Sequence, residues 1–164
     1  MAYADYDFYA NDFLGSAVPV DLFPQMSERA SAWIDILTND RLVDGLPTNT
    51  RHQKRIKMAV CELAELMYQI ALAEKNAINQ ASANLTDINV GNKSTGIVTS
   101  VSSGSESISY ATPQQIGASA KEWSAVYAAA GDAQKTNDLL LKTALPLLMG
   151  VRTDDGIPIL YAGV

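Results

Sequence analysis

Two residue types that often drive nucleophilic or acid–base catalysis, histidine and cysteine, each occur once in the chain, as His52 and Cys61. Such catalysis needs a base held beside an activated nucleophile. His52 stands among Arg51, Lys54 and Arg55, whose positive charges disfavour a protonated imidazole and build no triad. Cys61 lies in an apolar helical stretch, which favours burial over reactivity. The sequence therefore predicts a protein that is not an enzyme.

Acidic residues that could hold a cation occur near both ends of the chain. Asp5, Asp7 and Asp12 superficially resemble a calcium loop, but aromatic residues fill the gaps, and the glycine and the terminal glutamate of such a loop are missing. The stretch 154–156, Asp-Asp-Gly, is typical of a turn, with cation binding as the alternative. The glycines outside it stand singly, so no phosphate-binding loop is indicated. We therefore expect no metal ion and no cofactor.

Positive charge is concentrated in one place, where four of the 12 Lys and Arg residues lie within seven positions: Arg51, Lys54, Arg55 and Lys57. A solvated helix start explains such a cluster most simply. Pairing with an acidic neighbouring subunit and transient contact with DNA phosphates are the alternatives.

Composition narrows the class of protein that carries these residues. The chain has 164 residues, of which 48% are apolar and 18% charged, as in an ordinary soluble domain. A net charge of -6 argues against a protein that binds nucleic acid over its whole surface. The longest apolar runs are too short for a membrane span, and we expect neither a signal peptide nor a membrane partner. A single cysteine suits a reducing cytoplasm.

Apolar residues recur at helical spacing through most of the chain, which predicts a mainly α fold, a small helical bundle in one domain, with its helical core at about 5–80 and 113–149. A short helix is expected within 3–14. The next runs from Asp21, as N-cap, to Thr38. A long helix follows from a capping box at Thr50 and Gln53, with an indistinct end between 71 and 83. Further helices are expected at 113–131 and 133–149.

Two segments differ from this pattern. Between 84 and 112 charge nearly vanishes, and apolar residues alternate on either side of a Ser-Ser-Gly sequence, which predicts a β-hairpin insertion at about 93–111. Such a hairpin is not stable alone, so it must pack on the body of the protein or on a neighbouring subunit. The segment 150–164 combines glycines and a proline with an apolar run, and we expect an extended C-terminal arm.

Four stretches, in this order, resemble the head–tail connector, or adaptor, proteins of tailed bacteriophages, which dock beneath the portal. Residues 28–42 (ERASAWIDILTNDRL) and 56–68 (IKMAVCELAELMY) are similar to the first two core helices of that family. Residues 96–110 (GIVTSVSSGSESISY) resemble its serine-rich hairpin, and 160–164 (LYAGV) its terminus.

The resemblance implies a structural virion protein at the head–tail junction, assembled in the host cytoplasm. It would form a ring on the order of a dozen copies around the DNA channel. Its partners would be the portal, a stopper or tail-completion protein, and passing double-stranded DNA bound without sequence specificity. Another phage neck or tail-completion protein, or a small helical DNA-binding regulator, is the alternative. A small enzyme whose activity needs no histidine base also stays open.

Two groups of residues are then candidates for contacts. The C-terminal arm would reach the portal through Ile157, Ile159, Leu160, Tyr161 and Val164. The contact with the next subunit, or the channel lining, would come from the basic cluster and the hairpin: Arg51, Lys54, Arg55, Ile97, Val101, Ile108 and Tyr110.

Overall fold

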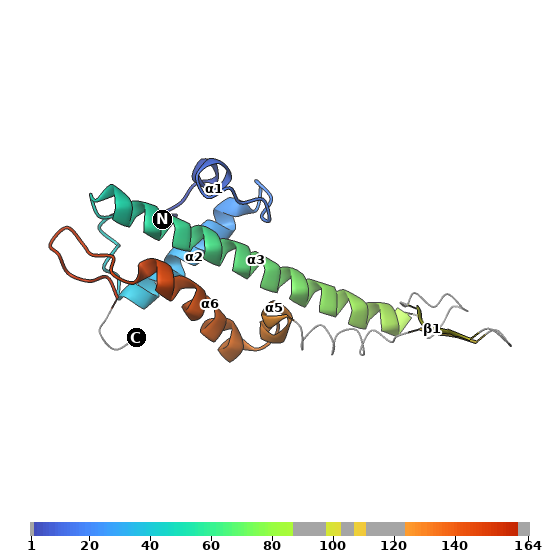
Figure 1. The fold of residues 1–164 in the computed structure, drawn as a ribbon. Coiled ribbons are helices and arrows are strands. Elements are labelled where there is room, and N and C mark those ends of the chain that lie inside the picture. Colours follow the sequence, from blue (N-terminus) through green and yellow to red (C-terminus); the bar gives the residue numbers. More distant parts are fainter. Residues whose placement is uncertain (1, 87–97, 103–106, 111–123, 161–164) are drawn as a thin grey trace. The chain divides into compact units, whose positions relative to one another are not determined.

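The computed structural model describes the backbone of residues 2–86, 98–102, 107–110 and 124–160, and the side chains of 2–79 and 124–160. The described chain is mainly helical, which confirms the predicted class (Figure 1). In chain order the elements are α1 (Tyr6–Asn11), α2 (Phe23–Thr38), α3 (Thr50–Thr86), β1 (Val98–Ser102), β2 (Ser107–Tyr110), α5 (Ala125–Ala129) and α6 (Ala133–Leu148).

The chain divides into two compact units, where the sequence predicts one domain. Unit 1 comprises residues 1–69 and 136–164, and unit 2 comprises 70–135. Helix α3 belongs to both, because its first 20 residues lie in unit 1 and the rest in unit 2. Unit 2 is therefore an insertion in the sequence of unit 1.

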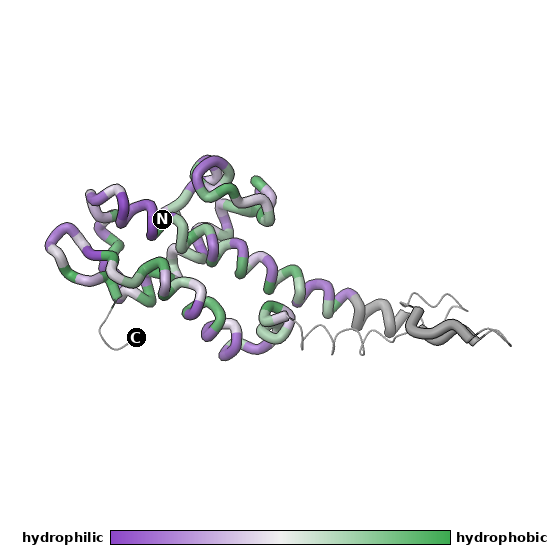
Figure 2. Tube along the Cα trace, in the orientation of Figure 1, coloured by the Kyte–Doolittle hydropathy of each residue, from purple (hydrophilic) through white to green (hydrophobic). Residues whose placement is uncertain are grey.

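The core of unit 1 forms around one face of α3. Ile56, Val60 and Leu63 are completely buried at the spacing the sequence predicts, and the tube in Figure 2 alternates between hydrophobic and hydrophilic residues along this helix. Helix α2 adds Ile34 and α6 adds Leu148, both fully buried. Each such side chain contributes roughly 1.5–3 kcal/mol of burial free energy.

Aromatic residues join α1 to this core. The rings of Tyr9 and Phe23 stack with centroids 4.4 Å apart, and Phe13 stacks on Tyr9 at 5.8 Å. The Tyr9 hydroxyl donates to Glu65 Oε1 at 2.6 Å and accepts from the backbone N–H of Val18 at 3.0 Å. The predicted short helix is thus confirmed, and its aromatic side chains anchor it.

Two of the predicted N-caps are wrong by a residue or more. Helix α2 begins at Phe23, because a turn at Pro19 already satisfies the N–H groups of Leu22 and Phe23, and Asp21 is not its cap. Helix α3 includes Thr50. The Asn49 side chain caps it instead, accepting from the N–H groups of the residues at 51 and 52 at 3.0 and 3.4 Å.

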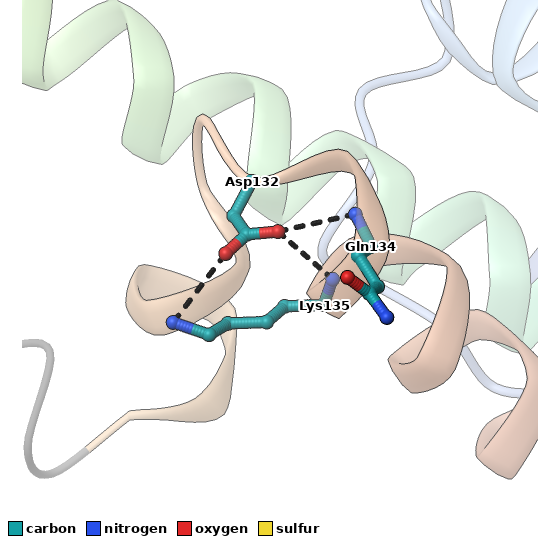
Figure 3. A network of polar contacts seen from close by, with 3 residues as sticks. All are labelled: Asp132, Gln134 and Lys135. Carbon is teal, nitrogen blue, oxygen red and sulfur yellow. Dashed lines mark hydrogen bonds and ion pairs between the residues drawn. The ribbon is translucent and has the colours of Figure 1, made fainter.

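Within unit 2, Ser124 has an extended backbone and caps α5. A helix cannot pass through this conformation, so the prediction of one helix over 113–131 is wrong at Ser124, and its part at 113–123 lies outside the described residues. Helix α6 begins two residues after α5's closing turn. Asp132 Oδ1 accepts from the N–H groups of Gln134 and Lys135 at 3.1 Å, and Lys135 Nζ lies 3.4 Å from Oδ2 (Figure 3).

Strands β1 and β2 pair antiparallel, with Val101 opposite Ile108 and an irregularity between Val98 and Ser100. They fall inside the segment for which the sequence predicts a hairpin insertion. The residues that would connect the strands, and most of those that flank them, lie outside the described chain, so the insertion as a whole stays a prediction.

The prediction of an extended C-terminal arm is wrong for residues 150–160, which we call the C-terminal turn. Val151 and Ile159 are fully buried in the core of unit 1, and the Ile159 N–H donates to the Val151 carbonyl at 3.1 Å. Arg152 and Pro158 form an antiparallel bridge, and Gly156, at φ 78°, closes the loop between them. The apolar run that suggested an exposed arm folds back because burial of its side chains stabilises the core.

Candidate functional site

The start of α3 and the segment before it hold the C-terminal turn through polar contacts. Asp154 Oδ1 accepts from both the N–H and the hydroxyl of Thr48, each at 2.8 Å. His52 Nδ1 lies 3.2 Å from the Arg152 carbonyl oxygen, and Arg41 Nη1 donates to the Pro158 carbonyl. The turn is therefore part of the folded body. Asp154 acts within it as a hydrogen-bond acceptor, in agreement with the turn that the sequence predicts.

Arg55 connects the basic cluster to α6. Its Nη2 donates to the carbonyl of Pro146 at 3.0 Å and to that of Met149 at 2.7 Å. These carbonyls lie at the C-terminal end of α6, where helix carbonyls lack intrahelical partners and a positive charge is favourable. Arg55 thus has a role inside the chain, whereas the resemblance made it a candidate for a subunit contact or the channel lining.

The other members of the cluster have different surroundings. Lys54 Nζ lies 3.9 Å from Asp12 Oδ1, with both side chains more than half exposed, so the pair adds little stability. Lys57 Nζ lies 5.2 Å from the centroid of the Phe8 ring of α1. Arg51 is exposed. The structure therefore separates the predicted cluster: Lys54 and Lys57 face α1, and Arg55 faces α6.

The predicted portal-contact residues are separated as well. Ile159 has no exposed surface and belongs to the core, so its prediction as a contact residue is wrong in this fold. Ile157 is 49% exposed and Leu160 is partly buried. Tyr161, Val164 and Ile97 lie outside the described residues, and for Val101, Ile108 and Tyr110 the structure describes the strand backbone alone.

Cys61, one of the two residues considered for catalysis, lies in the core of unit 1. Cys61 is buried, and burial, followed by the nearby charges of Glu65 and Glu62, raises the pKa of its thiol to about 12. A thiol held protonated in this way is a poor nucleophile.

In the described part of the chain no three His, Cys, Asp or Glu residues are grouped so that they could hold a metal ion. Nor is any described helix both long and apolar enough for a membrane span.

Sequence reasoning missed a group of exposed apolar residues in the loop between α1 and α2. Leu14 is 78% exposed, Val20 53% and Leu22 39%. Leu14 also has a left-handed backbone, at φ 62°, which costs about 1–2 kcal/mol in a residue with a Cβ. The signal in the sequence was the placement of these residues among aspartates, in a stretch without helical spacing.

Comparison with known proteins adds no assignment. The chain matches no family profile, no curated protein and no solved structure.

Proposed function

We propose that the protein is a structural subunit of a tailed-phage neck, forming a ring that joins the portal to the tail or stopper and continues the DNA channel. The observation that carries this proposal is the ordered resemblance of four stretches, at 28–42, 56–68, 96–110 and 160–164, to head–tail connector proteins. The proposed subunit would be a helical bundle that carries a β-hairpin insertion.

The described structure supports the proposal because the first two stretches form helices that pack in the same core. Residues 28–42 form most of α2 and its C-terminal turn, and 56–68 form the part of α3 whose apolar face lies in the core of unit 1. The first two stretches therefore build one packed body. The third includes the paired strands β1 and β2.

A ring subunit needs surface for its neighbours, and unit 1 has apolar surface available. Leu14, Ile36, Val43 and Met149 each expose more than 60% of their area. Large apolar side chains left exposed in this way would be buried in a contact with a neighbouring subunit. The C-terminal turn, held by Thr48 and Arg41, fixes the position of Leu160, after which the proposed contact with the portal would begin.

Native mass spectrometry of the purified chain, alone and mixed with the portal of the same phage, tests this proposal. A complex of one portal with many copies of the chain is the expected result, and its mass would count the subunits. A chain that binds neither itself nor the portal would contradict the connector role. Association with a tail protein instead would assign it to another neck or tail-completion layer.

A DNA-binding regulator would show salt-dependent affinity for duplex DNA in a binding titration. The contacts of Lys54 with Asp12 and of Arg55 with α6 leave a smaller basic surface for this role than the sequence suggests.

A further inference from the structure

We propose that two surfaces of unit 1 are complementary, and that the first surface of one copy docks on the second surface of the next copy. This inference rests on the proposed ring and names the contact that would build it. The first surface, the acidic patch, consists of Leu14, Val20 and Leu22 with Asp12 and Asp21. The second, the basic patch, consists of Lys142 and Pro146 of α6 and Met149 directly after it, with Arg51 and Arg55 of α3.

The acidic patch combines apolar exposure with charge of one sign. Its three apolar residues are 78%, 53% and 39% exposed, and both aspartates are exposed. Residues 2–28 contain four aspartates and a glutamate and no Lys, Arg or His. Lys54 offsets part of this charge by pairing with Asp12, which leaves Asp21 as the residue best placed to meet a positive partner.

The strongest evidence for a partner comes from Leu14. Its backbone has a left-handed conformation that Asn or Gly adopts at lower energy, and its side chain gains little from burial within the unit. Folding alone would therefore favour another residue at this position. Strained, exposed residues of this kind are concentrated at functional sites. An apolar anchor that inserts into a neighbouring subunit explains both features.

The basic patch has the matching composition. Lys142, Pro146 and Met149 follow the spacing of one helix face and are all exposed, Met149 by 64%. Arg55 reaches the end of this face through its bonds to the carbonyls of Pro146 and Met149, and Arg51 lies one turn before it on α3. The acidic residue on this helix face is Asp138, one turn before Lys142. Asp154, in the C-terminal turn, accepts hydrogen bonds from Thr48.

The two patches cannot meet within one copy. Lys54 pairs with Asp12 at the end of α1, and Lys57 lies over the Phe8 ring of α1. Arg55 bonds to α6 instead, so α1 and α6 lie on different sides of the first half of α3 (Figure 1). Contact between unlike surfaces of successive copies is heterologous, and it closes into a ring when the rotation between copies permits. Opposite charges around apolar anchors fix the orientation of such a contact.

Thiol cross-linking tests the contact directly. In a chain carrying both Leu14→Cys and Met149→Cys, a short bis-maleimide should produce a ladder of covalent oligomers. A mixture of the two single variants should stop at dimers, and each single variant alone should stay monomeric, since Cys61 is buried. Glu62→Cys in place of Met149→Cys is the control, because Glu62 is exposed on α3 outside both patches. No ladder above this control, under conditions in which the wild type forms rings, would overturn the proposal.

Charge reversal supplies an independent test. Asp21→Lys and Arg51→Glu should each raise the concentration for half-assembly about tenfold or more, and the two changes together should restore most of the loss. Glu62→Lys should have little effect. Additive losses in the double variant would contradict the pairing of the patches.

Leu14→Asn distinguishes an anchor from a structural residue. It should raise the melting temperature while it weakens assembly, and a lowered melting temperature with normal assembly would contradict the anchor role. A wild-type chain that stays monomeric alone and with the portal would defeat the proposed function itself. Normal rings from every variant would defeat the patch contact alone.

Discussion

Gly15 shows how closely single residues are fitted in this fold. A Cβ at this position would lie 2.1 Å from Cε2 of Tyr9, inside the ring that stacks on Phe23. The Gly15 N–H also donates to the Tyr9 carbonyl at 2.9 Å, so the backbone cannot move away without losing this bond. The loop after α1 is therefore fixed by a close approach of backbone to ring.

Gly15→Ala should lower the free energy of unfolding by about 1–3 kcal/mol, the usual range for overpacking a core. Chemical denaturation followed by circular dichroism measures this. Ser16→Ala, at the exposed next position, is the control and should change stability by less than about 0.5 kcal/mol. Equal stability of the two variants would show that the loop adjusts freely around Tyr9.

Titration of Cys61 and Tyr9 predicts loss of stability at alkaline pH. Burial raises the pKa of the Cys61 thiol from 9.0 to about 12, and burial with the hydrogen bond to Glu65 raises that of Tyr9 from 10.0 to about 12. Both groups hold their protons more tightly in the folded state, so the free energy of unfolding falls as pH rises from about 9 to 12.

Denaturation midpoints measured between pH 8 and pH 11 test this expectation. Cys61→Ala should show a shallower decline than the wild type above pH 9. The thiol of the wild type should also react with a thiol reagent at the rate of unfolding. Rapid labelling of the native protein at pH 8 would contradict the assigned burial.

At the scale of elements, Arg55 joins α3 to α6. Arg55→Met keeps much of the side chain's length and removes the donors to the Pro146 and Met149 carbonyls. It should destabilise the protein by roughly 1–2 kcal/mol, through the lost charge at the helix end and the lost bonds. Arg51→Met, which changes the same charge at an exposed position, is the matched control. Equal unfolding free energies for the two variants would rule out the cap.

The helices were largely predictable, because the residues at helical apolar spacing are the ones that the folded core buries. The stripe through Ile56, Val60 and Leu63 gave the position and face of α3. Caps depend on competition between neighbouring polar residues and turns, and the carbonyl of Pro19 made Asp21 unnecessary as a cap. Ile159 could not be placed from the sequence, because a short apolar run next to glycine suits an exposed arm and a returning turn equally well.

The candidate site was predictable in composition and less so in arrangement. The basic cluster stands out in the sequence, but the residues that engage it come from distant positions: Asp12 for Lys54 and the end of α6 for Arg55. Nothing in local spacing signals such contacts. The left-handed conformation at Leu14 could not be foreseen either, since a leucine there is locally unfavourable.

For the whole molecule, the burial of Ile159 changes what a C-terminal truncation is expected to do. Removing 157–164 takes away a fully buried core residue and the carbonyl that accepts from Arg41. We expect the free energy of unfolding to fall by about 2–5 kcal/mol, comparable with Ile→Ala in a core. Thermal melting measures it. Ile157→Ala, at a position 49% exposed, should be close to wild type.

The discontinuity of unit 1 has a consequence for biosynthesis. Its core includes Ala4 and Tyr9 near the beginning of the sequence and Val151 and Ile159 near the end, with all of unit 2 between them. A ribosome adds residues in order, so the core stays incomplete until Ile159 has left the exit tunnel. Until then α2 and the first half of α3 expose the face that α6 later covers. The core of this unit therefore cannot close before residue 159 has been translated, and until then the nascent chain exposes apolar surface that a chaperone would protect.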